Sequence, residues 1–211
     1  MDAVLPTPTA YGRVAKEGVV RRALSRWAFI AVIVAGGVLI AQSLYIPVKA
    51  QVAQVLLAEA FDEGLATKTP VKPWNWADTA PIARVSAPRL QESEIVLSGG
   101  SGEAMAFGPT ALIDDRSKGM TVLAAHRDTH FEFVQHLLIG DDVWLERIDG
   151  STANFRVARV EIVRWDEFSH PTDGRVQGVT GMIALTTCYP FDSDEAGPLR
   201  YVVWAHTHPD N

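Results

Sequence analysis

The chain has 211 residues, 47% of them hydrophobic and 21% charged, so it can bury the core of one enzyme domain and is not disordered as a whole. Its formal net charge of -6 provides no basic stripe for phosphate groups, which argues against a nucleic-acid partner. The sequence holds one cysteine, which excludes an internal disulfide and makes the position of that thiol informative.

A basic N-terminus, residues 1–27, precedes an uncharged apolar run over residues 28–46. As a helix this run would be about 28 Å long, close to the hydrocarbon thickness of a bilayer. Basic residues before such a run favour the cytoplasmic side. We therefore predict a retained single-pass anchor, with the N-terminus in the cytoplasm and residues 47–211 exported. A cleaved signal peptide and a buried core helix are the alternatives, but the run is longer than a usual signal core and apolar on every side.

Residues 47–81 are expected to form an amphipathic helix and then a docked linker. The apolar positions of the helix, over residues 48–66, recur at a spacing of three to four residues and include Val52, Val55 and Leu56. Residues 67–81 contain three prolines and are predicted to be extended. We expect Trp74 and Trp76 to fix this linker to the domain surface.

From residue 82 to residue 211 short strand-like runs alternate with turn residues, which predicts one β domain. The expected strands are Ile82–Val85, Glu94–Leu97, Thr121–Ala125, Val143–Arg147, Asn154–Val163, Met182–Thr187 and Leu199–Ala205. A bulge is expected in 154–163, where the alternation of apolar and polar residues is imperfect. In this region Phe131–Leu138 is the segment with a helical pattern. Seven or more short strands with one short helix indicate a closed or nearly closed β-barrel.

Three residues with chemical potential are predicted to lie at strand ends. Cys188 ends an apolar run and is followed by Tyr189 and Pro190, and proline cannot continue a central strand. His126 directly follows the run Thr121–Ala125, and Arg200 opens the last strand. If the three strands are neighbours, the thiol, the imidazole and the guanidinium meet at one edge of the barrel.

Several ordered motifs resemble the sortase family. The segment Ala184-Leu-Thr-Thr-Cys188 is similar to the sortase signature Thr-Leu-x-Thr-Cys, and Leu123-Ala-Ala-His-Arg127 resembles the Gly-His-Arg segment of sortases. Ala184 and Ala125 replace Thr and Gly of those motifs. Three further segments resemble the Gram-negative (proteobacterial) class of sortases: Pro73–Asp78, Arg127–Phe131, and Cys188–Phe191 together with Gly197–Tyr201. The likeness runs from about residue 27 to residue 207.

The resemblance implies a sortase-type closed β-barrel of about eight strands with one or two short helices, in residues 82–211, after the transmembrane helix and the amphipathic helix. It also implies a membrane-anchored cysteine transpeptidase. Such an enzyme cleaves a C-terminal sorting signal of the Leu-Pro-x-Thr-Gly type between Thr and Gly, forms a thioester and transfers the acyl group to an amine. The expected partners are an exported protein that carries the signal, an amine acceptor that the sequence does not identify, and the inner membrane, with the catalytic domain in the periplasm.

The catalytic residues implied are Cys188 as nucleophile, His126 as general acid and base, and Arg200 as the group that orients substrate and stabilises the oxyanion. The candidate substrate contacts are Thr187, Ala125 and Tyr189. Four of these residues have an ordinary structural alternative. Cys188 could be a small buried side chain, and His126 a hydrogen-bonded histidine at a strand end. Arg200 could form a surface ion pair, and Thr187 could serve strand packing.

Two other functions remain open. The protein could mainly hydrolyse its acyl-enzyme and release its target, or it could be a catalytically idle barrel that binds peptides. No cofactor and no metal are expected. His126 and His130 are four residues apart, but the Glu of the zinc motif His-Glu-x-x-His is absent and the first histidine ends a strand.

Overall fold

The computed structural model describes residues 11–169, 181–193, 195 and 197–207. The chain forms two units, Met1–Gln51 and Val52–Asn211, and helix α1 (Tyr11–Thr67) contributes to both. The other elements follow in the second unit: β1 (Pro81–Ala87), η1 (Pro88–Leu90), β2 (Glu92–Leu97), α2 (Gly102–Met105), β3 (Thr110–Asp115), β4 (Met120–Ala124), η2 (Glu132–His136), β5 (Asp142–Arg147), β6 (Thr152–Arg164), β7 (Met182–Tyr189) and β8 (Leu199–Thr207).

Helix α1 contains a candidate membrane span. Within the described residues, its portion Trp27–Thr67 is the helix that is long and apolar enough to cross a bilayer. Its large apolar side chains between Trp27 and Tyr45 are exposed. The predicted apolar helix is therefore confirmed. The predicted amphipathic helix is present as well, but as a continuation of the same helical element.

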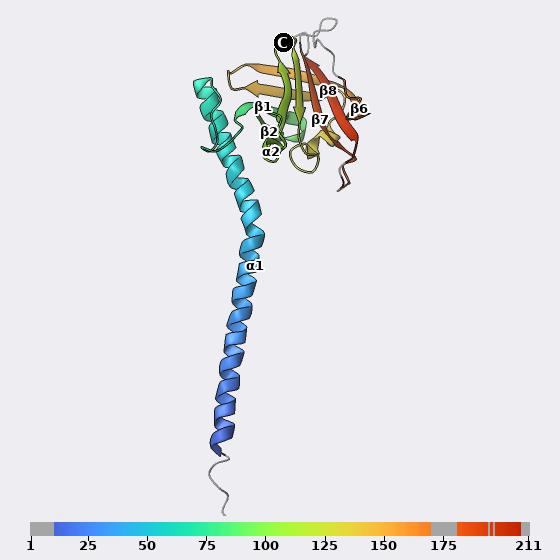
Figure 1. Ribbon diagram of the computed structural model, residues 1–211. Coiled ribbons are helices and arrows are strands. Elements are labelled where there is room, and N and C mark those ends of the chain that lie inside the picture. The colour runs from blue at the N-terminus through green and yellow to red at the C-terminus, as the bar shows by residue number, and fades with distance from the viewer. Residues whose placement is uncertain (1–10, 170–180, 194, 196, 208–211) are drawn as a thin grey trace, which may run out of the picture. The chain divides into compact units, whose positions relative to one another are not determined.

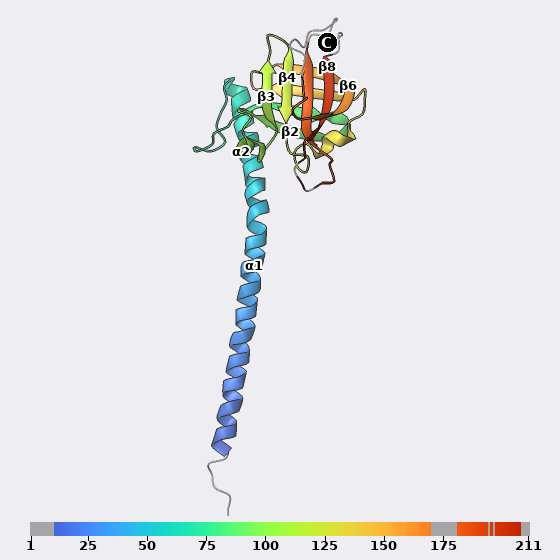
Figure 2. The same cartoon turned by 45° about the vertical axis from the view of Figure 1, so that its right-hand side comes forward.

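The eight strands close into a barrel, as predicted, and their order around it is β1-β2-β3-β4-β7-β8-β6-β5. Figure 1 shows β7 and β8 side by side, and Figure 2 shows β3 beside β4. Two neighbouring pairs, β2 with β3 and β4 with β7, are parallel, and the others are antiparallel. Because β4 and β7 are parallel, their carboxyl ends meet at the same edge of the sheet.

Alternation along the strands separates an inner apolar cluster from an outer one. The inner cluster fills the barrel and includes Leu123, Ile183, Leu185, Val203 and Ala205. The outer cluster lies on the opposite face of the same strands and includes Val122, Ala184, Val202 and Trp204. A residue's position in this alternation therefore shows which face of the barrel it occupies.

Strand β6 contains the predicted bulge, because its pairing with β8 changes register between Val157 and Arg159. Strand β3 is absent from the strands that the sequence predicts. Its sequence, TALIDD, offers only three consecutive apolar residues before two aspartates. Pairing with β4 and the end of β2 stabilises it as a strand, which is a tertiary effect that local pattern does not contain.

The buried face of the second part of α1 differs from the predicted one. Val52 and Val55 are exposed, whereas the buried side chains are Ala53, Leu57, Ala60 and Phe61. Their spacing of i, i+4, i+7 and i+8 is that of one helix face. The prediction of an amphipathic helix is right in kind, but it selected the wrong face.

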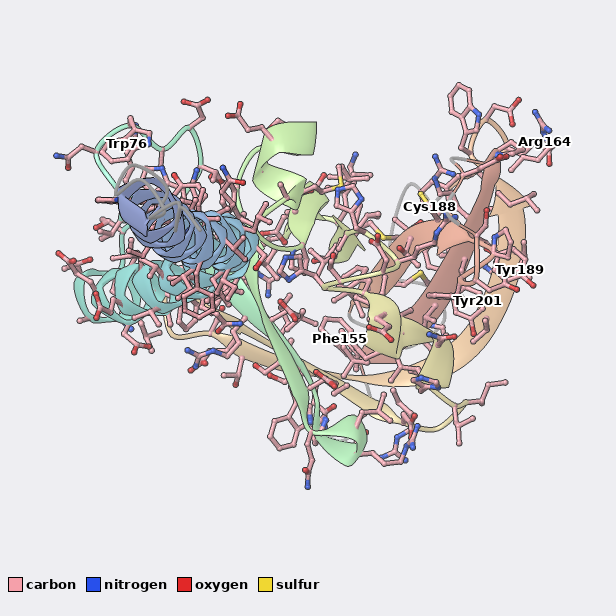
Figure 3. The ribbon with its side chains drawn as sticks, turned by 90° about the horizontal axis from the view of Figure 1, so that it is seen from below. Trp76, Phe155, Arg164, Cys188, Tyr189 and Tyr201 are labelled. Atoms are coloured by element: carbon pink, nitrogen blue, oxygen red, sulfur yellow. The ribbon has the colours of Figure 1, made fainter. Side chains whose placement is uncertain are left out.

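Of the two tryptophans expected to dock the linker, only Trp74 does so among the described contacts. Its ring meets that of Phe107 edge to face, with centroids 5.2 Å apart, beside buried Leu57 and Leu97. Trp76 is 81% exposed, so its prediction as an anchor is wrong. Figure 3 shows Trp76 far from Cys188 on the side of the barrel where α1 ends.

Candidate active site

The sheet register places the three predicted catalytic residues at the ends of adjacent strands. In the parallel pair β4–β7, Ala124 lies opposite Thr186, and the Ala125 amide continues the ladder by donating to the Thr186 carbonyl at 3.3 Å. Two residues beyond this pair on each of the two segments, the same register leads to His126 and Cys188. In the antiparallel pair β7–β8, Cys188 lies opposite Arg200.

Cys188 and Arg200 share the outer face of the barrel. Side chains alternate along a strand, so Cys188 lies on the face of Ala184, and Arg200 lies on the face of Val202. Both reference residues belong to the outer apolar cluster. The candidate site is therefore at the rim of the outer surface formed by β4, β7 and β8, outside the packed interior.

The thiol at this position is free and accessible. Cys188 is half-buried and forms no disulfide, and Figure 3 shows it near the rim of the strands. His126 is exposed. A thiol sealed in the core could not act as a nucleophile, whereas this partial exposure is compatible with attack on a peptide carbonyl.

One guanidinium nitrogen of Arg200 binds backbone carbonyls close to it in the sequence. Its Nη1 donates to the carbonyl oxygens of Gly197 and Leu199, at 2.9 and 2.8 Å. The remaining donors of the guanidinium have no partner among the residues the structure describes. They are available to a planar acceptor such as a peptide carbonyl.

The two candidate substrate contacts before the catalytic positions are buried. The Thr187 hydroxyl donates to the Ala125 carbonyl at 2.7 Å, and both residues lie in the interior. This hydrogen bond joins the residue before Cys188 to the residue before His126. Their side chains thus face the core, and their contribution to a site is to fix the two strand ends.

Tyr189 belongs to an aromatic group beside the thiol. Its ring stacks on that of Tyr201, with centroids 6.2 Å apart, and both meet the edge of Phe191. Figure 3 shows Tyr189 and Tyr201 next to each other near Cys188. Burial, and secondarily the neighbouring Tyr189, raises the pKa of Tyr201. The sequence signal for this group is the pair of motifs Cys-Tyr-Pro-Phe and Arg-Tyr.

His130 is bound to a carboxylate. Its Nδ1 lies 2.8 Å from Glu94 Oε2, at the wall of a 370 Å³ pocket bordered also by Glu92, Glu132 and His136. Across the described ranges, no group of three or more His, Cys, Asp or Glu side chains is arranged to hold a metal ion.

Sequence reasoning did not assign a role to Arg127, although the residue lies next to His126. Its side chain is 8% exposed, and its Nη2 donates to the carbonyl oxygens of Ser193 and Glu195. The sequence signal that could have singled it out is the segment similar to Gly-His-Arg, in which an arginine directly follows the candidate histidine.

The structure is thus a closed eight-stranded β-barrel with a free thiol on its rim, in register with a histidine and an arginine. The sortase domain matches residues 85–208, which is more than half of the chain. The chain therefore belongs to the sortase family, whose members are cysteine transpeptidases that act on proteins with sorting signals.

Solved structures support the same fold. Sortase A from Corynebacterium diphtheriae is 18% identical, with a TM-score of 0.52 over 64% of this chain and 66% of that one, slightly less than two thirds of its length. Sortase C1 from Streptococcus suis is 21% identical, with a TM-score of 0.52 over 62% and 74%. Sortase A from Listeria monocytogenes is 18% identical, with a TM-score of 0.52 over 61% and 87%. No curated protein matches the chain.

Proposed function

We propose that this protein is a membrane-anchored cysteine transpeptidase with Cys188 as nucleophile, His126 as general acid and base, and Arg200 as the oxyanion-stabilising group. The observation that carries the proposal is the register of β4, β7 and β8, which leads to these three residues at one rim. A half-buried thiol, an exposed histidine and an arginine whose remaining donors have no partner among the described residues supply the groups that acyl transfer requires.

The first half of the reaction forms the acyl-enzyme. The Cys188 thiolate attacks the carbonyl carbon of the scissile peptide bond, and the negative charge moves to the carbonyl oxygen. Arg200 stabilises this oxyanion with the donors that its backbone contacts leave free. The imidazolium of His126 gives its proton to the departing amine nitrogen, the C–N bond breaks, and a thioester remains.

The second half resolves the thioester. An incoming amine attacks the thioester carbonyl and gives a proton to the imidazole of His126. The C–S bond then breaks, which restores the Cys188 thiolate and the imidazolium. Water in place of the amine would release an acid instead, and this branch is the hydrolytic alternative.

The proposed substrate is an exported protein with a C-terminal Leu-Pro-x-Thr-Gly-like signal, cleaved between Thr and Gly. This assignment rests on the sortase motifs at Ala184–Cys188 and Leu123–Arg127. Thr187 and Ala125 would act on substrate through the strand ends that they fix. Tyr189, next to Cys188 in the chain, would border the bound peptide at the rim.

The proposed location is the inner membrane of a Gram-negative cell, with the catalytic domain in the periplasm. The exposed apolar run between Trp27 and Tyr45 supports an anchor, and the basic residues before it favour a cytoplasmic N-terminus. The motifs Pro73–Asp78 and Gly197–Tyr201 support the Gram-negative class.

The test uses the full-length protein in detergent with synthetic sorting-signal peptides from exported proteins of the same genome. Wild-type protein should gain the mass of the acyl fragment on Cys188, and Cys188→Ala should gain none while keeping its circular dichroism spectrum. Acyl transfer that persists in Cys188→Ala would refute the mechanism. Adding a glycine peptide as amine then measures how the acyl-enzyme divides between transfer and hydrolysis.

A further inference from the structure

The two arginines next to the site are bonded differently from the others. Seven arginines with described side chains form ion pairs with carboxylates: Arg84, Arg89, Arg116, Arg147, Arg156, Arg159 and Arg164. Among the arginines whose side chains the structure describes, Arg127 and Arg200 have no carboxylate partner and donate to backbone carbonyls.

All of these carbonyls lie on the connection between β7 and β8 or at its end. Arg127 Nη2 binds the carbonyls of Ser193 and Glu195, the latter at 2.8 Å. Arg200 Nη1 binds those of Gly197 and Leu199. Two guanidinium groups therefore hold four alternate carbonyls of the segment that links the proposed nucleophile to the proposed oxyanion-stabilising residue.

Burial makes the position of Arg127 costly. Its side chain is 8% exposed, and its Nη1 is buried without a hydrogen-bond partner among the described residues. Taking a guanidinium out of water without a carboxylate is unfavourable, and carbonyl acceptors offset this cost only in part. Arg127 also follows His126 directly, so its backbone lies just beyond the end of β4, and its side chain reaches the β7–β8 connection.

We propose that Arg127 is a positioning residue for acyl transfer: it fixes the β7–β8 connection against the His126 end of β4. This inference rests on the proposed function. Arg127 touches the connection and not the reacting atoms. By holding the connection, it keeps the rim beside Cys188 and Arg200 in one geometry, so that a peptide meets thiol, imidazole and guanidinium together.

Three variants of the full-length protein in detergent separate this role from a general effect on stability. Arg127→Met removes the donors and keeps most of the volume, and Arg127→Lys keeps the charge but not the fork. Arg147→Met is the matched control, because Arg147 is also poorly exposed but pairs with Asp114 at the other end of the barrel.

The first readout is independent of the substrate. A Glu-specific endoprotease cleaves the bond after Glu195, whose carbonyl Arg127 binds. Cleavage there should be about tenfold to a hundredfold faster in Arg127→Met, because charge-assisted hydrogen bonds are lost, and intermediate in Arg127→Lys. Arg147→Met should be cleaved at the wild-type rate at this bond.

The second readout compares a small reagent with a peptide. Alkylation of Cys188 by iodoacetamide should change less than about twofold in Arg127→Met, because the reagent needs only the thiolate. Acylation by the sorting-signal peptide should fall about tenfold to a hundredfold, mainly in kcat, since orientation at the reacting centre is lost.

Unchanged cleavage after Glu195 in both Arg127 variants would overturn the proposal, as would a loss of acylation no greater than that of Arg147→Met. If Arg127→Met does not fold, the same criteria apply to Arg127→Lys. A wild-type protein that forms no acyl-enzyme refutes the proposed function instead. The protease readout then still decides whether Arg127 holds the connection.

Discussion

The side-chain hydroxyl of Thr187 donates a 2.7 Å hydrogen bond to the backbone carbonyl of Ala125. The two residues lie one position before Cys188 and His126, on parallel strands that are also joined by the Ala125 amide and the Thr186 carbonyl. Because both partners are buried, water cannot replace the bond. The position of Cys188 relative to His126 along the two parallel segments therefore depends on this hydrogen bond.

Replacing Thr187 by Val should destabilise the barrel by about 1–3 kcal/mol, because the Ala125 carbonyl loses its side-chain partner in the interior. Acylation should fall further than this loss of stability explains, since the two strand ends are free to shift. Unfolding in denaturant and single-turnover acylation measure the two effects. Thr121→Val is the control: Thr121 is a buried threonine of β4 that bonds Asp114 away from the site. Equal effects of the two variants on acylation would argue against the positioning role of Thr187.

Arg200 gives a second prediction. Arg200→Met should lower kcat/KM for the sorting peptide by about 10²–10³-fold, the usual cost of removing one oxyanion donor. Arg200→Lys should recover little, because a single ammonium cannot serve the backbone carbonyls and a substrate oxygen at once. Steady-state kinetics on both variants is the measurement. Arg164→Met is the control, because Arg164 faces Leu199 on the neighbouring strand and pairs with Asp166. Near wild-type activity in Arg200→Met would remove Arg200 from the mechanism.

The strand ends were predictable from sequence because each carries a local signal. Pro190 marks the end of β7 after Cys188, and a change from apolar to polar residues, just before His126, marks the end of β4. The parallel pairing of β4 with β7 is not local. It brings together segments about sixty residues apart, and no pattern in either strand specifies its partner. The resemblance to sortase motifs, and not the periodicity of either strand, indicated that Cys188 and His126 belong to one site.

Other features depended on packing that sequence patterns do not encode. Leu57 rather than Val52 is buried because the barrel meets that face of the helix. Trp74 and Trp76 have similar local sequence, yet one reaches Phe107 and the other faces solvent. Nothing in the sequence indicated that Arg127 is buried, because its burial follows from the path of the β7–β8 connection. Side-chain environment is the part of a site that local pattern predicts least well.

A pH effect on stability follows from Asp141. The hydrogen bond from Arg89 is the largest cause that lowers the pKa of this carboxyl, and the Leu138 amide adds to it. A folded-state pKa below the unfolded value means that the unfolded chain binds protons more readily. The stabilisation by Asp141 is therefore complete above the unfolded carboxyl pKa of about 3.9 and disappears as the pH falls through the lower folded value.

Asp141→Asn should accordingly be less stable than wild type at neutral pH, and the difference should shrink as the pH is lowered below about 4. Denaturation midpoints between neutral and acidic pH test this. Asp166→Asn serves as the comparison, since Asp166 pairs with Arg164 on the open surface, where ion pairs contribute little. A gap between Asp141→Asn and wild type that stays constant with pH would show that charge is not the cause.

The linker tryptophans offer a matched pair of substitutions for the packing of the second unit. Trp74 contacts Phe107 edge to face beside Leu57 and Leu97, and Gln54 donates to the Phe107 carbonyl at 2.8 Å. Trp74→Ala should lower the free energy of unfolding by about 2–3 kcal/mol, because a large half-buried ring leaves a gap beside the helix. Trp76→Ala should change it by less than about 0.5 kcal/mol, since its side chain is mostly in solvent. Denaturant unfolding of the full-length protein measures both, and equal losses would mean that Trp76 is held by contacts other than those described. Because Trp74 packs with Phe107, Leu57 and Leu97 and not with a residue of the proposed site, its loss should leave the acylation rate of the folded fraction unchanged, which separates docking of the linker from gating of the site.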